Sequence, residues 1–200
     1  MLSPSRALRA AVVLLAAGAA LGGCVQKAVE PPPPLTFTQH GTVSLDVAQV
    51  MVVPEYQPRM TPPNVEHLSP MPPTDAVGRW ASDRFRAAGR SGVLRVIVKD
   101  ASIKEVQLPR TQGLSGFFTK DQAWRYDGRL EVELVAQQPD RNSFQGYASA
   151  IVSRSVTVPE DISIAERERI WLNLTRQMMD DLNARFEDGI RTNLTPIVLY

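Results

Sequence analysis

The sequence predicts an α+β fold, a two-layer α/β sandwich with the element order β-α-β-β-β-α. Its sheet is four-stranded and mainly antiparallel, with both helices on one face. Two observations predict this fold. Residues 130–136 alternate between apolar and mostly charged side chains, as in a strand with one buried and one solvent-facing side. Residues 75–88 and 163–194 each carry apolar side chains along one helical stripe, so both helices can cover the buried face of the sheet.

The first half of the chain supplies one strand and one helix. Apolar residues predict a strand over 43–53, and the connection over 54–73 is rich in proline. Apolar side chains in this connection indicate that it packs on the surface of the domain: Val65, Leu68 and Met71. Helical spacing predicts a helix over 75–88, with Thr74 as its N-cap and Gly89 at its end.

Three further strands follow in the second half. A strand is predicted over 93–98, and its extension to Val106 is left open. The clearest strand covers 126–136, and turn-forming residues follow at 139–143. In-phase apolar residues then predict a strand over 147–158. These strands follow one another closely in the sequence, so they form a meander.

The capping-box sequence Ser163-Ile-Ala-Glu166 opens the longest predicted helix. Its apolar residues keep to one stripe: Ile164, Trp171, Leu174, Met178, Leu182, Phe186 and Ile190. Thr195-Pro196 ends it, because proline cannot continue the backbone hydrogen bonding of a helix. About 30 residues at 1.5 Å per residue give a length of roughly 45 Å.

The N-terminus carries the parts of a secretory signal. Residues 1–9 contain Arg6 and Arg9 and no acidic side chain, and residues 10–21 form an unbroken apolar run. As a helix this run is about 18 Å long, well short of the ~30 Å that a membrane-spanning helix needs. Together with the small residues that follow, these features predict a cleaved signal peptide over 1–23.

The last residues of the signal and the one that follows, Leu21-Gly22-Gly23-Cys24, resemble the bacterial lipobox. The resemblance implies that Leu21, Gly22 and Gly23 are recognised by the signal peptidase and that the Cys24 thiol receives the lipid. Cys24 is the only cysteine of the chain, and two acyl chains suffice for stable membrane attachment. Val25 stands where Asp tends to retain a lipoprotein in the inner membrane, which implies the outer membrane and a periplasm-facing domain. A plain signal peptide with a chance cysteine is the alternative.

Charge and motif content argue against several functions. Loss of the signal removes two of the 22 basic residues, which leaves 20 against 21 acidic ones and no electrostatic case for a nucleic-acid partner. His40 and His67 have no partner at metal-ligand spacing, so we expect neither a metal nor a cofactor. The Gly-Leu-Ser-Gly-Phe sequence at 113–117 lacks the second glycine of a nucleophile elbow. We therefore expect no enzymatic activity.

The connection over 107–125 is unusually apolar for a loop and carries four large side chains: Leu114, Phe117, Phe118 and Trp124. In one interpretation it folds back over the open end of the sandwich. In the other it contacts a partner or a lipid, with Phe117 and Phe118 as anchors and Lys120 and Arg125 beside them.

In plan, residues 43–194 resemble small envelope lipoproteins that act as non-catalytic accessories. Two such families are the lipopolysaccharide-assembly lipoprotein, which plugs a barrel, and the auxiliary lipoproteins of lipid-transport ABC systems. Val25-Gln26 departs from the Gly-Phe that commonly follows the lipid cysteine of the former family. Sequences at 64–68 (Asn-Val-Glu-His-Leu), 79–80 (Arg-Trp) and 157–160 (Thr-Val-Pro-Glu) also resemble a group of lipoproteins without an assigned function.

The expected organisation is a signal peptide over 1–23, a lipidated and proline-rich tether over 24–42, one α/β domain over 43–195 and a tail over 196–200. The expected function is that of a lipid-anchored protein that scaffolds or assists a cell-envelope complex through an unidentified protein partner. The alternative is a carrier that binds a lipid or another apolar ligand between the sheet and the helices.

Overall fold

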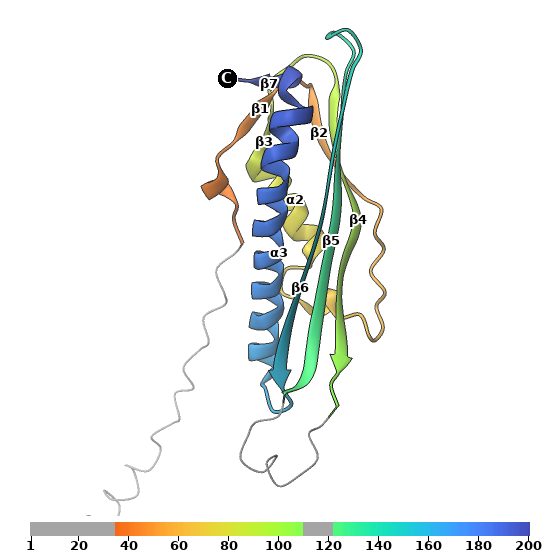
Figure 1. The fold of residues 1–200 in the computed structure, drawn as a ribbon, viewed down its shortest axis with the longest axis vertical. Coiled ribbons are helices and arrows are strands. Elements are labelled where there is room, and N and C mark those ends of the chain that lie inside the picture. Colours follow the sequence, from red (N-terminus) through yellow and green to blue (C-terminus); the bar gives the residue numbers. More distant parts are fainter. Residues whose placement is uncertain (1–34, 110–121) are drawn as a thin grey trace, which may run out of the picture. The chain divides into compact units, whose positions relative to one another are not determined.

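The computed structural model describes residues 35–109 and 122–200 (Figure 1). Within these ranges it contains two sheets: a larger one with the strand order β2-β4-β5-β6 and a smaller one with the order β3-β1-β7. The residues of the predicted lipobox lie outside the described residues: Leu21, Gly22, Gly23 and Cys24. Three of the four large side chains of the 107–125 connection also lie outside them: Leu114, Phe117 and Phe118.

The larger sheet is mixed and mainly antiparallel, as predicted. It consists of β2 (Gln49–Pro54), β4 (Val93–Gln107), β5 (Gln122–Gln138) and β6 (Phe144–Pro159). β2 runs parallel to β4, whereas the pairs β4–β5 and β5–β6 are antiparallel. The strand predicted over 93–98 does extend, through Val106 to Gln107.

Two helices, α2 (Pro73–Arg84) and α3 (Ile164–Asn193), pack against this sheet, which confirms the predicted α+β sandwich. The capping box at Ser163 forms as predicted: its hydroxyl accepts from the Glu166 N–H, and the Glu166 carboxylate accepts from the Ser163 N–H at 2.9 Å. The space between sheet and helices is filled by fully buried side chains: Leu94, Val96, Leu130, Leu134, Met178 and Leu182. Of the predicted stripe on α3, only Ile164 in the first turn is exposed.

The predicted strand over 43–53 is wrong as a single element. It divides into β1 (Val43–Leu45) of the smaller sheet and β2 of the larger one. Between them Val47 is fully buried, and the Asp46 N–H donates to the Ile197 carbonyl at 2.7 Å. The apolar alternation of Val43, Leu45 and Val47 changes phase at Ala48-Gln49, which the sequence alone suggests is a bulge within one strand; the chain instead changes sheets there.

The predicted bounds of the first helix, 75–88, are also wrong. The helix begins at Pro73, where a missing N–H costs no helical hydrogen bond, so Thr74 is not its N-cap. It ends at Arg84 because Phe85–Ala87 forms β3, which pairs in parallel with β1. Gly89 does not end the helix; a Cβ atom there would lie 2.6 Å from the Asp46 backbone, so glycine permits a close approach of two chain segments.

The packed domain includes residues on both sides of the expected 43–195. Leu35 and Phe37 are buried, although the sequence analysis assigned 24–42 to the tether. At the other end Ile197 is fully buried, and β7 (Val198–Leu199) pairs with β1. The packed domain therefore includes Leu35 and Phe37, and β7 completes the smaller sheet.

The proline-rich connection covers part of one edge of the larger sheet. We call residues 55–72 the covering segment. It is bound to β4 by backbone hydrogen bonds: Tyr56 N–H to the Val98 carbonyl, Val65 N–H to the Ile103 carbonyl, and Glu105 N–H to the Pro63 carbonyl, at 2.8–2.9 Å. Val65 is buried, Met71 packs against the core and Leu68 is exposed, so two of the three predicted contacts form.

Candidate functional site

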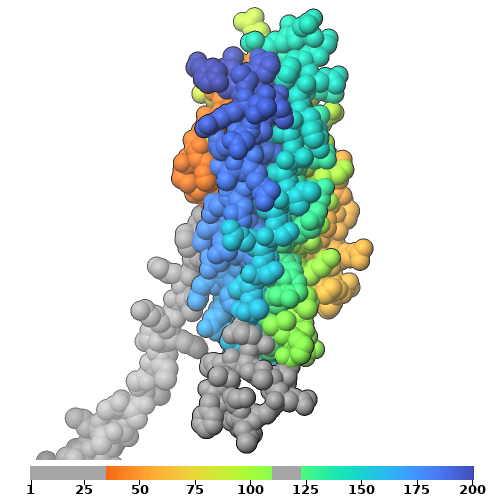
Figure 2. Space-filling model, in the orientation of Figure 1, coloured from red at the N-terminus to blue at the C-terminus, as the bar shows by residue number. Residues whose placement is uncertain are grey.

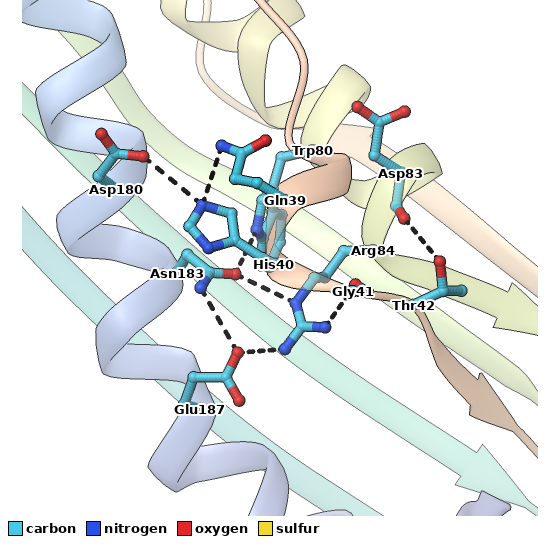
Figure 3. A network of polar contacts seen from close by, with 10 residues as sticks. All are labelled: Gln39, His40, Gly41, Thr42, Trp80, Asp83, Arg84, Asp180, Asn183 and Glu187. Atoms are coloured by element: carbon cyan, nitrogen blue, oxygen red, sulfur yellow. Dashed lines mark hydrogen bonds and ion pairs between the residues drawn. The ribbon is translucent and has the colours of Figure 1, made fainter.

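Residues 35–42, which we call the strap, lie against both helices just before the chain enters β1. The strap contains a short 3-10 helix over Thr38–His40. The Phe37 N–H donates to the Asp83 carboxylate at 2.9 Å, and the Thr42 hydroxyl donates to the Asp83 carbonyl at 3.2 Å. Asp83, near the end of α2, therefore holds the strap at two points, and Figure 3 shows its contact with Thr42.

Arg84, at the end of α2, is the centre of this site. Only 4% of the residue is exposed, and an unpaired guanidinium at that depth would be costly. Each of its three nitrogens donates: Nη1 to the Gly41 carbonyl at 2.6 Å, Nε to Asn183 Oδ1 at 3.2 Å, and Nη2 to the Glu187 carboxylate, with which it forms an ion pair. One side chain thus joins the strap, α2 and α3.

Trp80 extends the site into the core. It lies one turn before Arg84, and its indole N–H donates to the same Asn183 Oδ1 at 3.0 Å. Its ring stacks on Phe186 at a centroid distance of 5.5 Å and meets the edge of Phe85 at 5.2 Å. Trp80 is fully buried, so the polar contacts of Asn183 rest on a packed aromatic base.

The outer side of the strap site is held by His40 and Gly41. His40 Nε2 lies 3.5 Å from the Asp180 carboxylate of α3, which makes an ion pair when the imidazole is protonated. Gly41 has a φ of +72°, a conformation that side chains with a Cβ atom rarely adopt. Its carbonyl is thereby turned to accept from Arg84.

The polar side chains of the strap site form hydrogen bonds and ion pairs with one another and with the backbone of the strap. In the part of the chain that the structure describes, no three His, Cys, Asp or Glu side chains gather closely enough to hold a metal ion. His67 lies in the 3-10 helix Glu66–Leu68, far along the chain from His40, so the structure gives neither histidine a second imidazole partner. The strap site fixes where the chain enters the domain through hydrogen bonds and ion pairs.

A second feature is an apolar pocket of about 330 Å³ at the start of α3. Its apolar lining consists of Leu68 from the covering segment and Ile162, Ile164 and Trp171 from the region of the capping box and α3. Arg167 and Glu168 line the rest of the pocket. Leu68 and Ile164 are 52% and 77% exposed, respectively, which is high for large apolar side chains. Trp171 is buried, and its ring meets the Tyr126 ring in an edge-to-face arrangement at a centroid distance of 5.5 Å.

Of the four residues predicted to contact a partner, the structure describes only Trp124. It lies on β5 opposite Gln107 of β4 and Val158 of β6, where it is half-buried and packs against the core. At least part of its indole therefore serves the domain itself.

Sequence reasoning missed the strap site because its residues look ordinary one by one. Trp80 and Arg84 are spaced i, i+4, as are Asn183 and Glu187, so each pair occupies one face of its helix. A polar residue inside an apolar stripe was the available signal, because buried polar groups need partners.

No known family model matches the chain, and no curated protein matches it in sequence. Two solved structures are similar to it at a low level. Rare lipoprotein B from Shewanella oneidensis is 12% identical with a TM-score of 0.37, over 72% of this chain and 95% of that one. A minor lipoprotein from Acinetobacter baumannii is 13% identical with a TM-score of 0.34, over 78% of this chain and 98% of that one.

Proposed function

We propose that the chain is a non-enzymatic lipoprotein of the outer membrane, anchored through a lipid on Cys24, whose periplasm-facing domain scaffolds or assists an envelope complex. The lipobox-like sequence ending in Cys24 is the observation that carries this proposal. No helix in the described ranges is long and apolar enough to cross a membrane. Attachment at Cys24 would therefore supply the membrane contact.

The strap supports the same proposal by limiting how far the domain can move from its anchor. Cys24 and Leu35 are eleven residues apart, which span at most about 40 Å when fully extended. Because Leu35 and Phe37 are buried and Asp83 and Arg84 bind the strap, no further chain can be drawn out of the domain without breaking these contacts. An anchored domain would reach only partners close to the bilayer.

The anchor is tested by labelling cells with palmitate. We expect the full chain to take up label and fractionate with the outer membrane, and Cys24→Ser to do neither. Gly23→Ala keeps a small residue before the cysteine and is the matched control, expected to be labelled like the parent. A Cys24→Ser chain that is processed and membrane-bound like the parent would refute the anchor.

We assign the partner contact to the four large side chains of the 107–125 connection, Leu114, Phe117, Phe118 and Trp124, of which Trp124 is half-buried in the domain. Large aromatic side chains are typical centres of protein interfaces. In intact cells, cross-linking of the lipidated chain should capture one envelope protein, and Phe117→Ala/Phe118→Ala should reduce that product at least tenfold. Tyr200→Ala, which removes a fully exposed aromatic ring elsewhere, is the control. An unchanged product in the double variant would exclude this segment as the contact.

The pocket at the start of α3 favours a second candidate, a carrier of an apolar ligand. Side chains fill the space between sheet and helices, so this pocket, lined by Leu68 and Ile164, is the better place for such a ligand. Mass spectrometry of the natively purified chain should then detect a bound lipid that Ile164→Glu loses and Ile164→Val keeps. A ligand-free parent protein would refute the carrier.

A further inference from the structure

β6 forms one outer edge of the larger sheet over a length of 16 residues. In the described ranges it pairs with β5 and with no other strand. α3 lies against Gly146 at the start of β6 but against Gly128 of β5 further along. The helix thus crosses from the edge to the middle of the sheet, and β6 stays at the surface beside it (Figure 2).

Alternate residues of β6 direct their backbone groups away from β5. The Tyr147 carbonyl accepts from Asn193 Nδ2 of α3 at 2.8 Å, so Tyr147 faces outward. In an antiparallel pair, backbone N–H and C=O groups turn to one side and then the other at successive residues. The pairing with β5 is regular from Phe144 to Val158, so Ser149, Ile151 and Ser153 also turn their N–H and C=O groups outward.

The outer edge of β6 carries few of the features that prevent strands from adding to a sheet. Such features are charges, prolines, bulges and short length. Between Gln145 and Val158 there is no proline, and Arg154 is the single charged residue. The Arg154 guanidinium is turned to α3, where Nε and Nη2 donate to the Asp181 carboxylate at 2.6 and 2.8 Å.

We infer that β6 pairs with β6 of a second copy of this chain, antiparallel and about a two-fold axis at Ile151. The outward row reads Ser149, Ile151, Ser153, the same in both directions, so a two-fold axis sets Ile151 opposite Ile151 and Ser149 opposite Ser153. Each such pair exchanges two backbone hydrogen bonds. This symmetry is the reason to choose a second copy over an unrelated strand.

Side-chain properties select the same register. Ile151 is 44% exposed, and its contact with its own copy would cover apolar surface. Tyr147 would lie opposite Ser155, a large side chain beside a small one, and Arg154 opposite Ala148. A register centred three residues later would place the two Arg154 residues opposite each other, which repulsion disfavours.

Disulfide trapping in the full chain tests this pairing. With the axis at Ile151, the two Cα atoms of Ile151→Cys lie about 5.5 Å apart, within reach of a disulfide. Ser155→Cys, on the same strand and also exposed, is the matched control, because eight residues, about 27 Å, would separate its two copies. We expect at least half of Ile151→Cys in covalent dimers, and less than a tenth of Ser155→Cys or the parent chain. Equal trapping of both variants, or trapping of neither, would overturn the inference.

A charge introduced at the axis provides a second measurement. Ile151→Lys would place two ammonium groups opposite each other, so we expect light scattering of the detergent-solubilised chain to show at least a tenfold loss of dimer with an unchanged circular dichroism spectrum. Gln137→Lys adds the same charge on the exposed side of β5 and should leave the dimer intact. A monomeric parent chain, or a dimer unaffected by Ile151→Lys, would contradict the pairing. Any disulfide through an unlipidated Cys24 would also appear in the parent chain, so failure of the anchor and failure of the dimer are distinguishable.

Discussion

The two edges of the larger sheet are built in opposite ways. β2 has six residues and ends in Pro54, and beyond it the covering segment is hydrogen-bonded along β4. β6 has 16 residues, and in the described part of the molecule no segment continues along its outer side. The comparison shows that protection of a sheet edge is local: the same chain closes one edge with a proline-rich connection and leaves the other able to accept a strand.

The side chains that stabilise the two edges differ as well. Glu66, 1% exposed, holds the covering segment, because its carboxylate accepts from the Tyr56 hydroxyl at 2.7 Å, from the Asn64 amide at 3.2 Å and from the Ile103 N–H at 3.2 Å. At β6 the corresponding link is the surface pair Arg154–Asp181, whose Arg154 side chain is 48% exposed. Buried, fully bonded carboxylates contribute more to stability than exposed pairs, so substitutions should affect the two edges unequally.

The largest effect should come from proline substitutions that distinguish the two sides of β6. Val152→Pro removes an N–H that faces β5, and we expect the free energy of unfolding to fall by about 3 kcal/mol or more. Ser153→Pro removes an outward N–H and should cost the isolated monomer less than about 1 kcal/mol. Urea unfolding of both variants measures the difference. Equal losses of unfolding free energy in the two variants would show that the N–H groups of Val152 and Ser153 do not face different sides of β6.

A smaller effect is expected at the covered edge. Glu66→Leu leaves the Ile103 N–H and the Asn64 amide without their acceptor and should lower the free energy of unfolding by about 2–3 kcal/mol. Glu66→Gln keeps an acceptor oxygen and should lose less. Hydrogen exchange at the Ile103 amide should accelerate in the leucine variant more than in the glutamine variant. If both variants keep the parent's stability and exchange rates, Glu66 does not hold the covering segment.

The smallest effect is pH-dependent. Burial, followed by the hydrogen bond to Glu66 and its negative charge, raises the pKa of Tyr56 above its ordinary 10.0. Because the folded pKa is the higher one, the contribution of Tyr56 to stability is complete below pH 10 and declines as the pH rises above it. Tyr56→Phe should therefore lower the free energy of unfolding by about 1 kcal/mol at pH 8, and less at pH 11. A difference that grows above pH 10 would contradict this sign.

The sheet was predictable because its signals are local. Alternation over 130–136, the turn residues after it and the capping box at Ser163 each specify structure within a few positions, and the structure contains all three. The charged side chains on the exposed face of the sheet form ion pairs with one another. The Arg129 guanidinium lies 3.2 Å from the Asp100 carboxylate and 2.8 Å from the Glu131 carboxylate.

What the sequence did not reveal depends on contacts between distant segments. The apolar spacing of α2 continues through Phe85, yet the backbone there is extended because it pairs with β1, about 40 positions earlier. The burial of Leu35 and Phe37 likewise depends on distant parts of the chain, and the Phe37 N–H donates to Asp83, 46 positions later. The local preference of residues for helix or strand does not predict such long-range pairings, because tertiary contacts override it.

The position of β1 has a mechanical consequence. The strap leads directly into β1, the central strand of the smaller sheet, with parallel β3 on one side and antiparallel β7 on the other. A pulling force on the N-terminal side must first detach the Arg84 and Asp83 contacts and then load both neighbours of β1 at once. Tension from the N-terminal side would therefore be shared between β3 and β7 instead of detaching a single edge strand.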